Sequence, residues 1–196
     1  MMRFITVLSA LALTSSIALA QKAPVQHSDS KGKAGTTSTE MPTGATGNKN
    51  DVASSNFVQK AAMSDQFEIE SSKLALQKAT DPQIKQFAQQ MIDEHSKSSD
   101  KLKATLQSAG ANMSPPAGLA LDAKHQALMD KLQKASGKEF ERLYVQIQRD
   151  GHKEAVDLFS KYSKDGKEAS LKGFAQETLP VIEKHLQHAQ SLKVTT

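Results

Sequence analysis

The 196-residue chain contains no cysteine and has a formal net charge of +4 at pH 7. The lack of cysteine excludes disulfide bonds and thiolate metal sites. Acidic and basic residues are interspersed, without an arginine-rich run or an interleaved aromatic patch, so the charge does not indicate a nucleic-acid partner.

Residues 1–20 have the features of a secretory signal peptide. The segment contains a basic residue, Arg3, then an apolar stretch, Phe4–Leu13, and then the small residues of a cleavage site at Ala18–Ala20. We therefore expect cleavage after Ala20 and a periplasmic or secreted mature protein. The apolar stretch is too short for a transmembrane helix, and no later segment is apolar enough to form one.

Residues 21–52 form a low-complexity segment rich in Gly, Ser, Thr, Lys and Pro. Its only sizeable apolar residues up to Asp51 are Val25 and Met41, so it cannot bury enough surface to offset the entropy of ordering. The composition predicts a disordered linker. A spacer role and a tolerated flexible terminus are both compatible with it.

Residues 53–196 have a helical pattern and the length of one domain. The first helix is expected from about Ser55 to Ala79. An N-cap and a first-turn proline, Asp81 and Pro82, then begin a second helix that ends at Gly110. The inward stripes of these helices comprise Ala61, Asp65, Glu68, Ser72, Ala75 and Ala79, and Ile84, Ala88, Met91, His95, Ser98 and Leu102.

A short helix bearing Leu121 to Leu132 is expected next. The spacing of Ser136 and Glu139 matches a capping box and predicts the start of the third long helix. That helix ends near Asp165, and the fourth contains Pro180, which should kink or loosen it. No strand pattern competes. The prediction is an all-α, antiparallel four-helix bundle with a short extra helix between helices two and three.

A hexapeptide recurs in the two predicted hairpins. Ile84–Gln89 (IKQFAQ) returns 87 residues later as Leu171–Gln176 (LKGFAQ). The two copies occupy equivalent places, which favours a bundle of two similar halves. Phe87 and Phe174 are accordingly expected in the core.

The chain resembles domain-of-unknown-function family 4142, whose members are exported, ferritin-like four-helix bundles that often carry a membrane-protein label. The resemblance implies a fold and an exported location but little chemistry. The family usually has an acidic residue immediately before the helix-three histidine, where this chain has Gly151, so that position supplies no carboxylate partner for His152. The matching stretches are Phe57–Leu76, Phe87–His95, Gly137–Tyr144, His152–Phe159 and Leu179–Gln190.

Polar residues within the apolar stripes are the main chemical signal. They fall within about five positions of one level, which corresponds to about 7–8 Å along the bundle. Imidazoles and a carboxylate that converge there could bind Zn²⁺, Cu²⁺ or Fe²⁺. The predicted metal ligands are Glu68, His95, His152 and His185, with Asp65 and His188 as second choices.

Each of these histidines could instead be a core residue bonded to a carboxylate or a carbonyl group. In either case His95 is expected to contact Asp65 or Glu68, because an unpartnered interior polar group is costly. His125 is interpreted as a packing residue.

Two function classes follow: a metal-binding module, and a non-catalytic envelope or stress-related protein that acts through a structural role or an envelope partner. Enzymatic activity is not indicated. The Glu-x-x-His motif of di-iron oxidases is absent, since Ile92, Arg149 and Ile182 stand where its glutamates would be. Nucleophile and phosphate-loop motifs are absent as well.

Overall fold

The computed structural model describes residues 49–109 and 120–194, so the predicted signal peptide and most of the predicted linker lie outside the described residues. The described part is entirely helical and contains no strand. This confirms the predicted all-α class. The helices are α1 (Lys49–Lys78), α2 (Pro82–Ser108), α3 (Ala123–Lys134), α4 (Gly137–Asp165) and α5 (Ala169–Ser191).

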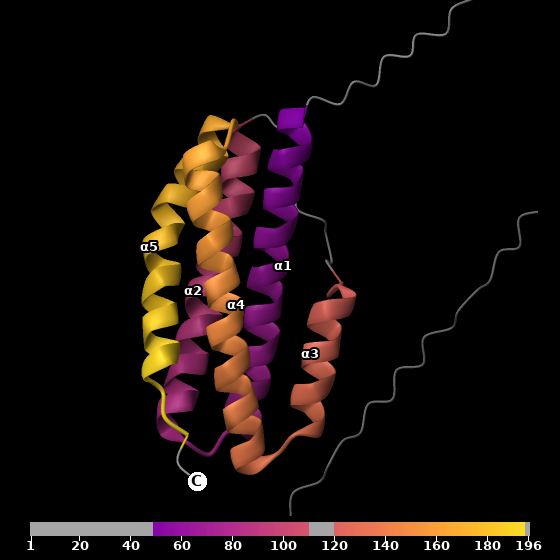
Figure 1. Cartoon of the computed structure of the whole chain (residues 1–196), viewed down its shortest axis with the longest axis vertical. Helices are drawn as coiled ribbons and strands as arrows, with labels where there is room; N and C mark the ends of the chain where they lie inside the picture. Colours follow the sequence, from indigo (N-terminus) through magenta and orange to yellow (C-terminus); the bar gives the residue numbers. More distant parts are fainter. Residues whose placement is uncertain (1–48, 110–119, 195–196) are drawn as a thin grey trace, which may run out of the picture. The chain divides into compact units, whose positions relative to one another are not determined.

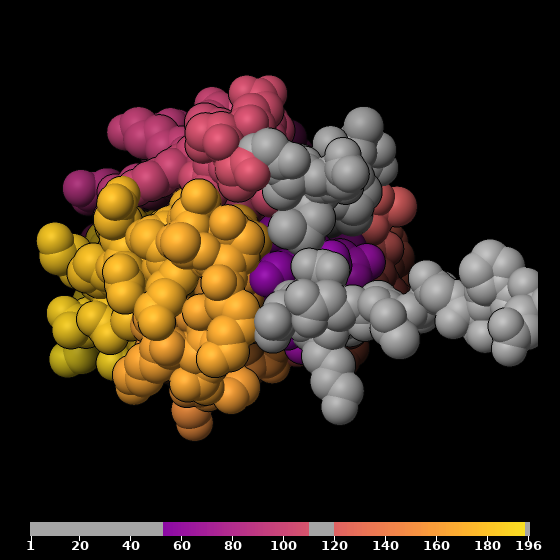
Figure 2. All heavy atoms as spheres, turned by 90° about the horizontal axis from the view of Figure 1, so that it is seen from above, coloured from indigo at the N-terminus to yellow at the C-terminus, as the bar shows by residue number. Residues whose placement is uncertain are grey.

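Four of the helices form the predicted bundle. α1 packs against α2 and α4, and α5 packs against the same two helices. The chain runs in opposite directions along the two helices of each neighbouring pair, so these pairs are antiparallel (Figure 1). The short α3 lies outside the bundle beside α1 and α4, in the connection between α2 and α4. Figure 2 shows the bundle from the end where α2 stops and α5 starts. No helix in the described part of the chain is long and apolar enough to cross a membrane.

α1 begins at Lys49, six residues before the expected Ser55. Residues 49–52, which the composition assigned to a disordered linker, are therefore helical. The adjoining turn is fixed in the core, because Phe57 is 2% exposed and the Ser54 hydroxyl hydrogen-bonds the Tyr162 hydroxyl at 2.8 Å. Anchoring of this turn allows the helix to extend into a segment with little apolar content of its own.

The predicted start of α2 is confirmed. Asp81 has extended backbone angles, and its side chain accepts a hydrogen bond from the Gln83 amide at 2.8 Å. The capping box predicted for α4 is wrong. The helix starts there, but the Ser136 side chain makes no capping hydrogen bond, and Gly137 has a φ of +54°. The left-handed entry at this glycine differs from the backbone geometry that a capping box needs.

α5 is a single helix from Ala169 to Ser191 that continues through Pro180. The proline therefore does not divide it, although it leaves one carbonyl of the preceding turn without a helical donor. The Glu168 side chain caps the first turn by accepting a hydrogen bond from the Leu171 amide at 2.8 Å.

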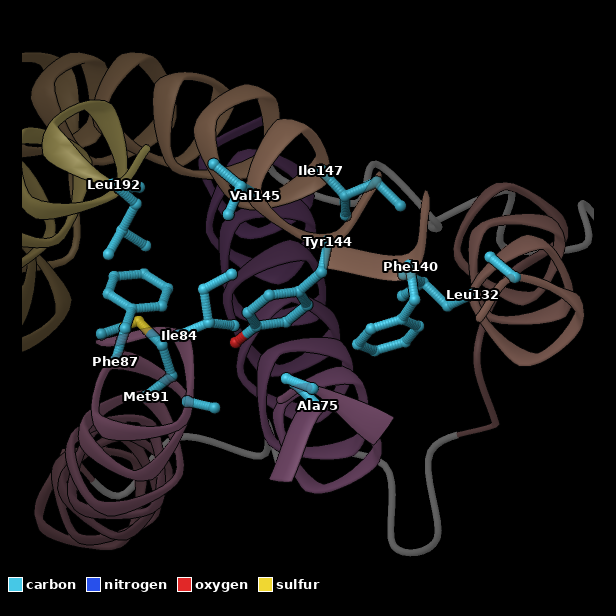
Figure 3. Close-up of a cluster of buried hydrophobic side chains, with 14 of the residues drawn as sticks. Ala75, Ile84, Phe87, Met91, Leu132, Phe140, Tyr144, Val145, Ile147 and Leu192 are labelled. Atoms are coloured by element: carbon cyan, nitrogen blue, oxygen red, sulfur yellow. The ribbon is translucent and has the colours of Figure 1, made fainter. Parts of the chain in front are cut away.

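The core consists of two apolar clusters. The lower cluster includes Ile84, Phe87, Met91, Phe140 and Tyr144 (Figure 3). The upper cluster includes Phe57, Leu102, Phe159, Leu171, Phe174 and Ile182. The repeated hexapeptide contributes one phenylalanine to each cluster, and both are confirmed as core residues with Phe87 at 0% and Phe174 at 2% exposure.

A polar layer separates the two clusters. Each bundle helix passes from one cluster to the other, and the change falls at Asp65 in α1, His95 in α2, His152 in α4 and His185 in α5. Every one of these side chains is buried. Titratable groups from all four helices therefore meet at the middle of an apolar bundle.

Candidate metal centre

Three histidines from three helices converge in the polar layer. His95, His152 and His185 are 5%, 1% and 2% exposed, and one ring nitrogen of each lies within 4.8 Å of those of the other two. Their ring centroids are 5.3–5.6 Å apart. In the described part of the chain, His95 Nε2, His152 Nε2 and His185 Nδ1 are buried without a hydrogen-bond partner. Buried nitrogens are rarely left unpaired, so three of them in one layer are an unusual feature of the core.

The other nitrogen of each ring is hydrogen-bonded to an oxygen atom of the protein. His95 Nδ1 is 2.8 Å from Asp65 Oδ1, and His185 Nε2 is 2.7 Å from Glu94 Oε2. His152 Nδ1 lies 2.8 Å from the carbonyl oxygen of Gln148, one turn earlier in α4. Because each acceptor is an oxygen, each of these nitrogens carries the proton. In the neutral rings the remaining nitrogens therefore keep their lone pairs, the arrangement found in metal-binding histidines.

The electrostatic environment keeps two of the rings neutral. Burial, reinforced by the charge of His95, lowers the pKa of His152 to about 3. Burial also lowers the pKa of His185 to about 4, against the opposing hydrogen bond to Glu94. For His95 burial alone would lower the pKa, but the hydrogen bond and charge of Asp65 raise it above its usual value. The neutral rings of His152 and His185 thus each leave one lone pair available at neutral pH.

Glu68 is the carboxylate that lies beside these rings. It is 2% exposed, and its Oε1 is 3.8 Å from His152 Nδ1. Its Oε2 is buried and has no hydrogen-bond partner among the described residues. Burial raises the pKa of Glu68, against the lowering effect of His95 and of a hydrogen bond from Gln148. A cation in the layer would favour the ionised carboxylate, which could then act as a fourth ligand.

Gly151, the departure from the family pattern, lies beside Glu68. A Cβ atom at this position would lie 3.4 Å from Glu68 Oε1, so a residue here sits directly against that carboxylate. An acidic side chain would bring a second negative charge next to it. His152 Nδ1 donates its hydrogen bond to the Gln148 carbonyl instead.

The donor set fits a transition-metal ion in chemistry and approximately in spacing. Bonds of about 2.0–2.1 Å to one Zn²⁺ would place neighbouring nitrogens about 3.3–3.6 Å apart. The widest separation of 4.8 Å would therefore have to shorten by about 1.2–1.5 Å.

The structure brings together Glu68, His95, His152 and His185 as the sequence predicted. The expected contact between His95 and a helix-one carboxylate is confirmed, with Asp65 as the partner. His188 stands apart from the cluster, because its Nδ1 is 3.0 Å from Gln90 Oε1.

Two hydrogen-bond partners of the layer histidines were not predicted from the sequence. Glu94 was missed because it is a half-buried residue next to the inward stripe of α2, and pairing across the antiparallel α2 and α5 is the signal that could have identified it. The hydrogen bond from His152 to the Gln148 carbonyl depends on the rotamer of the His152 side chain, which no sequence pattern specifies. His125 is confirmed as a packing residue, with its ring centroid 4.9 Å from that of Phe67.

These features define a class of protein: an all-α, four-helix bundle with a buried layer of histidines and carboxylates. The chain belongs to the family called Domain of unknown function (DUF4142), whose model matches residues 38–192. This confirms the resemblance found in the sequence. No functionally curated protein matches the sequence.

Solved structures that share the fold include two forms of CopM and a DUF305 protein. CopM in its Cu(I)-bound form is 20% identical, with a TM-score of 0.56, covering 69% of this chain and 91% of CopM. CopM in its Cu(II)-bound form is 19% identical, with a TM-score of 0.58, covering 69% of this chain and 92% of CopM. A DUF305 protein from Streptomyces coelicolor, described as secreted, is 17% identical, with a TM-score of 0.57, covering 70% and 89%. At these identities the likeness shows the fold alone.

Proposed function

We propose that this protein binds one divalent transition-metal ion, Cu²⁺ or Zn²⁺, in the polar layer. His95, His152 and His185 provide the nitrogen ligands, and Glu68 provides a carboxylate. The observation that carries the proposal is the convergence of three buried nitrogens that have no hydrogen-bond partner among the described residues.

The donor chemistry supports these ions. Imidazole nitrogen suits Cu²⁺, Zn²⁺ and Fe²⁺, and affinity for a given nitrogen and oxygen site rises from Fe²⁺ to Cu²⁺. Fe²⁺ is therefore expected to bind most weakly of the three. The copper-bound forms of CopM, a protein of the same fold, support copper as the first ion to test.

Export is part of the same proposal. The basic residue, apolar stretch and Ala18–Ala20 cleavage site lie outside the described residues, but they support a periplasmic or secreted location. The secreted description of the DUF305 neighbour points the same way. N-terminal sequencing of the exported protein is expected to begin at Gln21, and a retained Met1 would contradict this part.

Calorimetric titration of the metal-free protein tests the binding proposal. Cu²⁺ and Zn²⁺ are expected to bind with one tight site per chain. The His152→Ala variant should lose that site, because it removes a ligand whose lone pair is free at neutral pH. His125→Ala is the matched control, since His125 packs against Phe67 outside the layer.

The variants also separate metal binding from a structural role. If the layer only supports the fold, His152→Ala will lower the melting temperature equally with EDTA and with added metal. If it binds metal, wild-type protein will gain stability with metal and the variant will not. Equal melting of the wild type in all conditions would overturn the proposal.

A further inference from the structure

The proposed metal site, on which this inference rests, has no direct access to solvent. The layer histidines are 1–5% exposed. The two apolar clusters close the layer along the bundle axis, and a cation that crossed packed apolar side chains would lose its hydration without compensation. An ion must therefore reach the layer sideways, between helices and past polar groups.

A small cavity provides such a passage. It has a volume of about 20 Å³, enough for about one water molecule or a bare metal ion, and it adjoins His95 and His185. Part of its wall is half-buried, so the cavity extends from near the surface to the histidine layer. The polar residues of its lining are Ser64, Asp65, Glu94, Ser98 and Thr178.

Glu94 lies between solvent and the layer. Its side chain is 33% exposed, and its Oε2 accepts a hydrogen bond from His185 Nε2 at 2.7 Å. Its Oε1 accepts a second hydrogen bond from Gln90 Nε2 at 3.1 Å. A carboxylate in this position attracts cations from solvent. Its bond to His185 also ties the carboxylate to the orientation of a ligand ring.

We propose that Glu94 is the entry residue of the metal site. A divalent cation first binds the Glu94 carboxylate at the surface, which releases the hydrogen bond to His185. The ion then passes through the cavity to the three histidine nitrogens, and Glu94 returns to His185. Only hydrogen bonds and metal–ligand bonds change in this sequence. Because Glu94 helps the ion to cross in either direction, it should accelerate both entry and exit.

Stopped-flow mixing of the purified, metal-free protein with Cu²⁺ tests this role. The two tyrosines of the chain, Tyr144 and Tyr162, serve as the fluorescent reporters that bound Cu²⁺ quenches. Glu94→Gln keeps an oxygen that can accept the His185 hydrogen bond but removes the charge. Its association and dissociation rate constants should both fall about tenfold, with a much smaller change in Kd.

Two further variants make the test specific. Glu183→Gln removes an exposed negative charge two residues before His185 in α5. It should leave both rate constants unchanged. Ala155→Val adds two methyl groups to the cavity wall without touching Glu94, and it should also slow entry and exit.

The outcomes distinguish the entry role from the metal site itself. Wild-type rates in Glu94→Gln overturn the entry role while leaving the proposed site intact. A loss of affinity with an unchanged association rate also overturns it, because Glu94 would then act only by orienting His185. No saturable Cu²⁺ binding by the wild type overturns the proposed function and the entry role together.

Discussion

At the scale of single residues, the layer differs from a set of core histidines in the way each ring is oriented. A structural histidine usually satisfies both nitrogens, whereas each of these three pairs one nitrogen and leaves the other free. The pairing partners are two carboxylates and one backbone carbonyl. They fix the proton on the outer nitrogen and direct the lone pair inward.

Asp65 should therefore control affinity without touching the ion. In Asp65→Asn the amide oxygen can still accept the hydrogen bond from His95 Nδ1, but the negative charge is lost. We expect metal affinity to fall about 10–100-fold, as measured by competition with a chelator of known affinity. Asp93→Asn, an exposed position on α2, is the control. An equal affinity in wild type and Asp65→Asn would contradict the assigned role.

The sequence predicted that the four proposed ligand residues lie inside the bundle, because stripe positions determine which residues face inward. It predicted that His95 contacts Asp65 or Glu68, because these residues lie at a similar distance from the Asp81–Pro82 turn, and the structure selects Asp65. It did not predict the unpartnered nitrogens. These depend on ring rotamers, and a rotamer is chosen by packing among residues that are distant in the sequence.

At the scale of helices, a buried carboxylate joins α4 to the turn between α1 and α2. Glu141 is 0% exposed, and its Oε1 accepts hydrogen bonds from the Thr80 amide and hydroxyl and from the Asp81 amide at 2.7–2.9 Å. The Lys138 ammonium lies 3.0 Å from Oε2. Burial alone would raise the pKa of Glu141, but hydrogen bonds from Asp81, Lys138 and Thr80 lower it to about 2.

This carboxylate should make stability sensitive to acid. Because its pKa is lower in the folded state than its ordinary 4.5, its contribution is present above about pH 4.5 and lost as the pH falls toward 2. The shift corresponds to about 3 kcal/mol at neutral pH and about 1 kcal/mol at pH 3. Urea unfolding should show that wild type has a larger free energy of unfolding than Glu141→Gln at neutral pH. This difference should become smaller as the pH falls to 3.

Glu139→Gln serves as the control for that experiment, since Glu139 is an exposed acidic residue in the same turn of α4. It should change stability little at either pH. A difference between wild type and Glu141→Gln that is the same at pH 6 and pH 3 would show that the charge of Glu141 does not stabilise the turn.

Helix boundaries were predictable where local chemistry sets them. Asp81 and Pro82 define the start of α2 through a side-chain cap and a missing amide donor, both of which are readable in the sequence. The start of α1 was not predictable, because it depends on how Phe57 packs against Tyr162 and Phe159 in α4. The Ser136 cap failed for a similar reason: the backbone of Gly137 determines how the chain enters α4.

At the scale of the whole molecule, one apolar cluster lies on each side of the polar layer, and the two copies of the repeated hexapeptide lie in different clusters. Phe87 anchors the lower cluster and Phe174 the upper one. Replacement of either by Ala should lower the free energy of unfolding by about 3–5 kcal/mol, because each leaves a cavity in a packed core. Chemical denaturation measures this directly. A loss near zero for one variant would show that its cluster does not support the fold.

The order of helices and the bundle class were predictable from periodicity, since every long helix carries an inward stripe. The position of the polar layer between two clusters was predictable only in part. Counting from the helix turns placed the polar residues near one level, but the four helices must be assembled before the apolar clusters on either side of that level are seen.

A crystal structure of the protein grown with Zn²⁺ or Cu²⁺ and recorded at the metal's absorption edge tests the central claim most directly. The account predicts one strong anomalous peak inside the bundle, about 2.0–2.2 Å from one nitrogen of each of His95, His152 and His185 and from a Glu68 oxygen. Peaks confined to surface residues, with the layer histidines hydrogen-bonded to one another or to water, would contradict it.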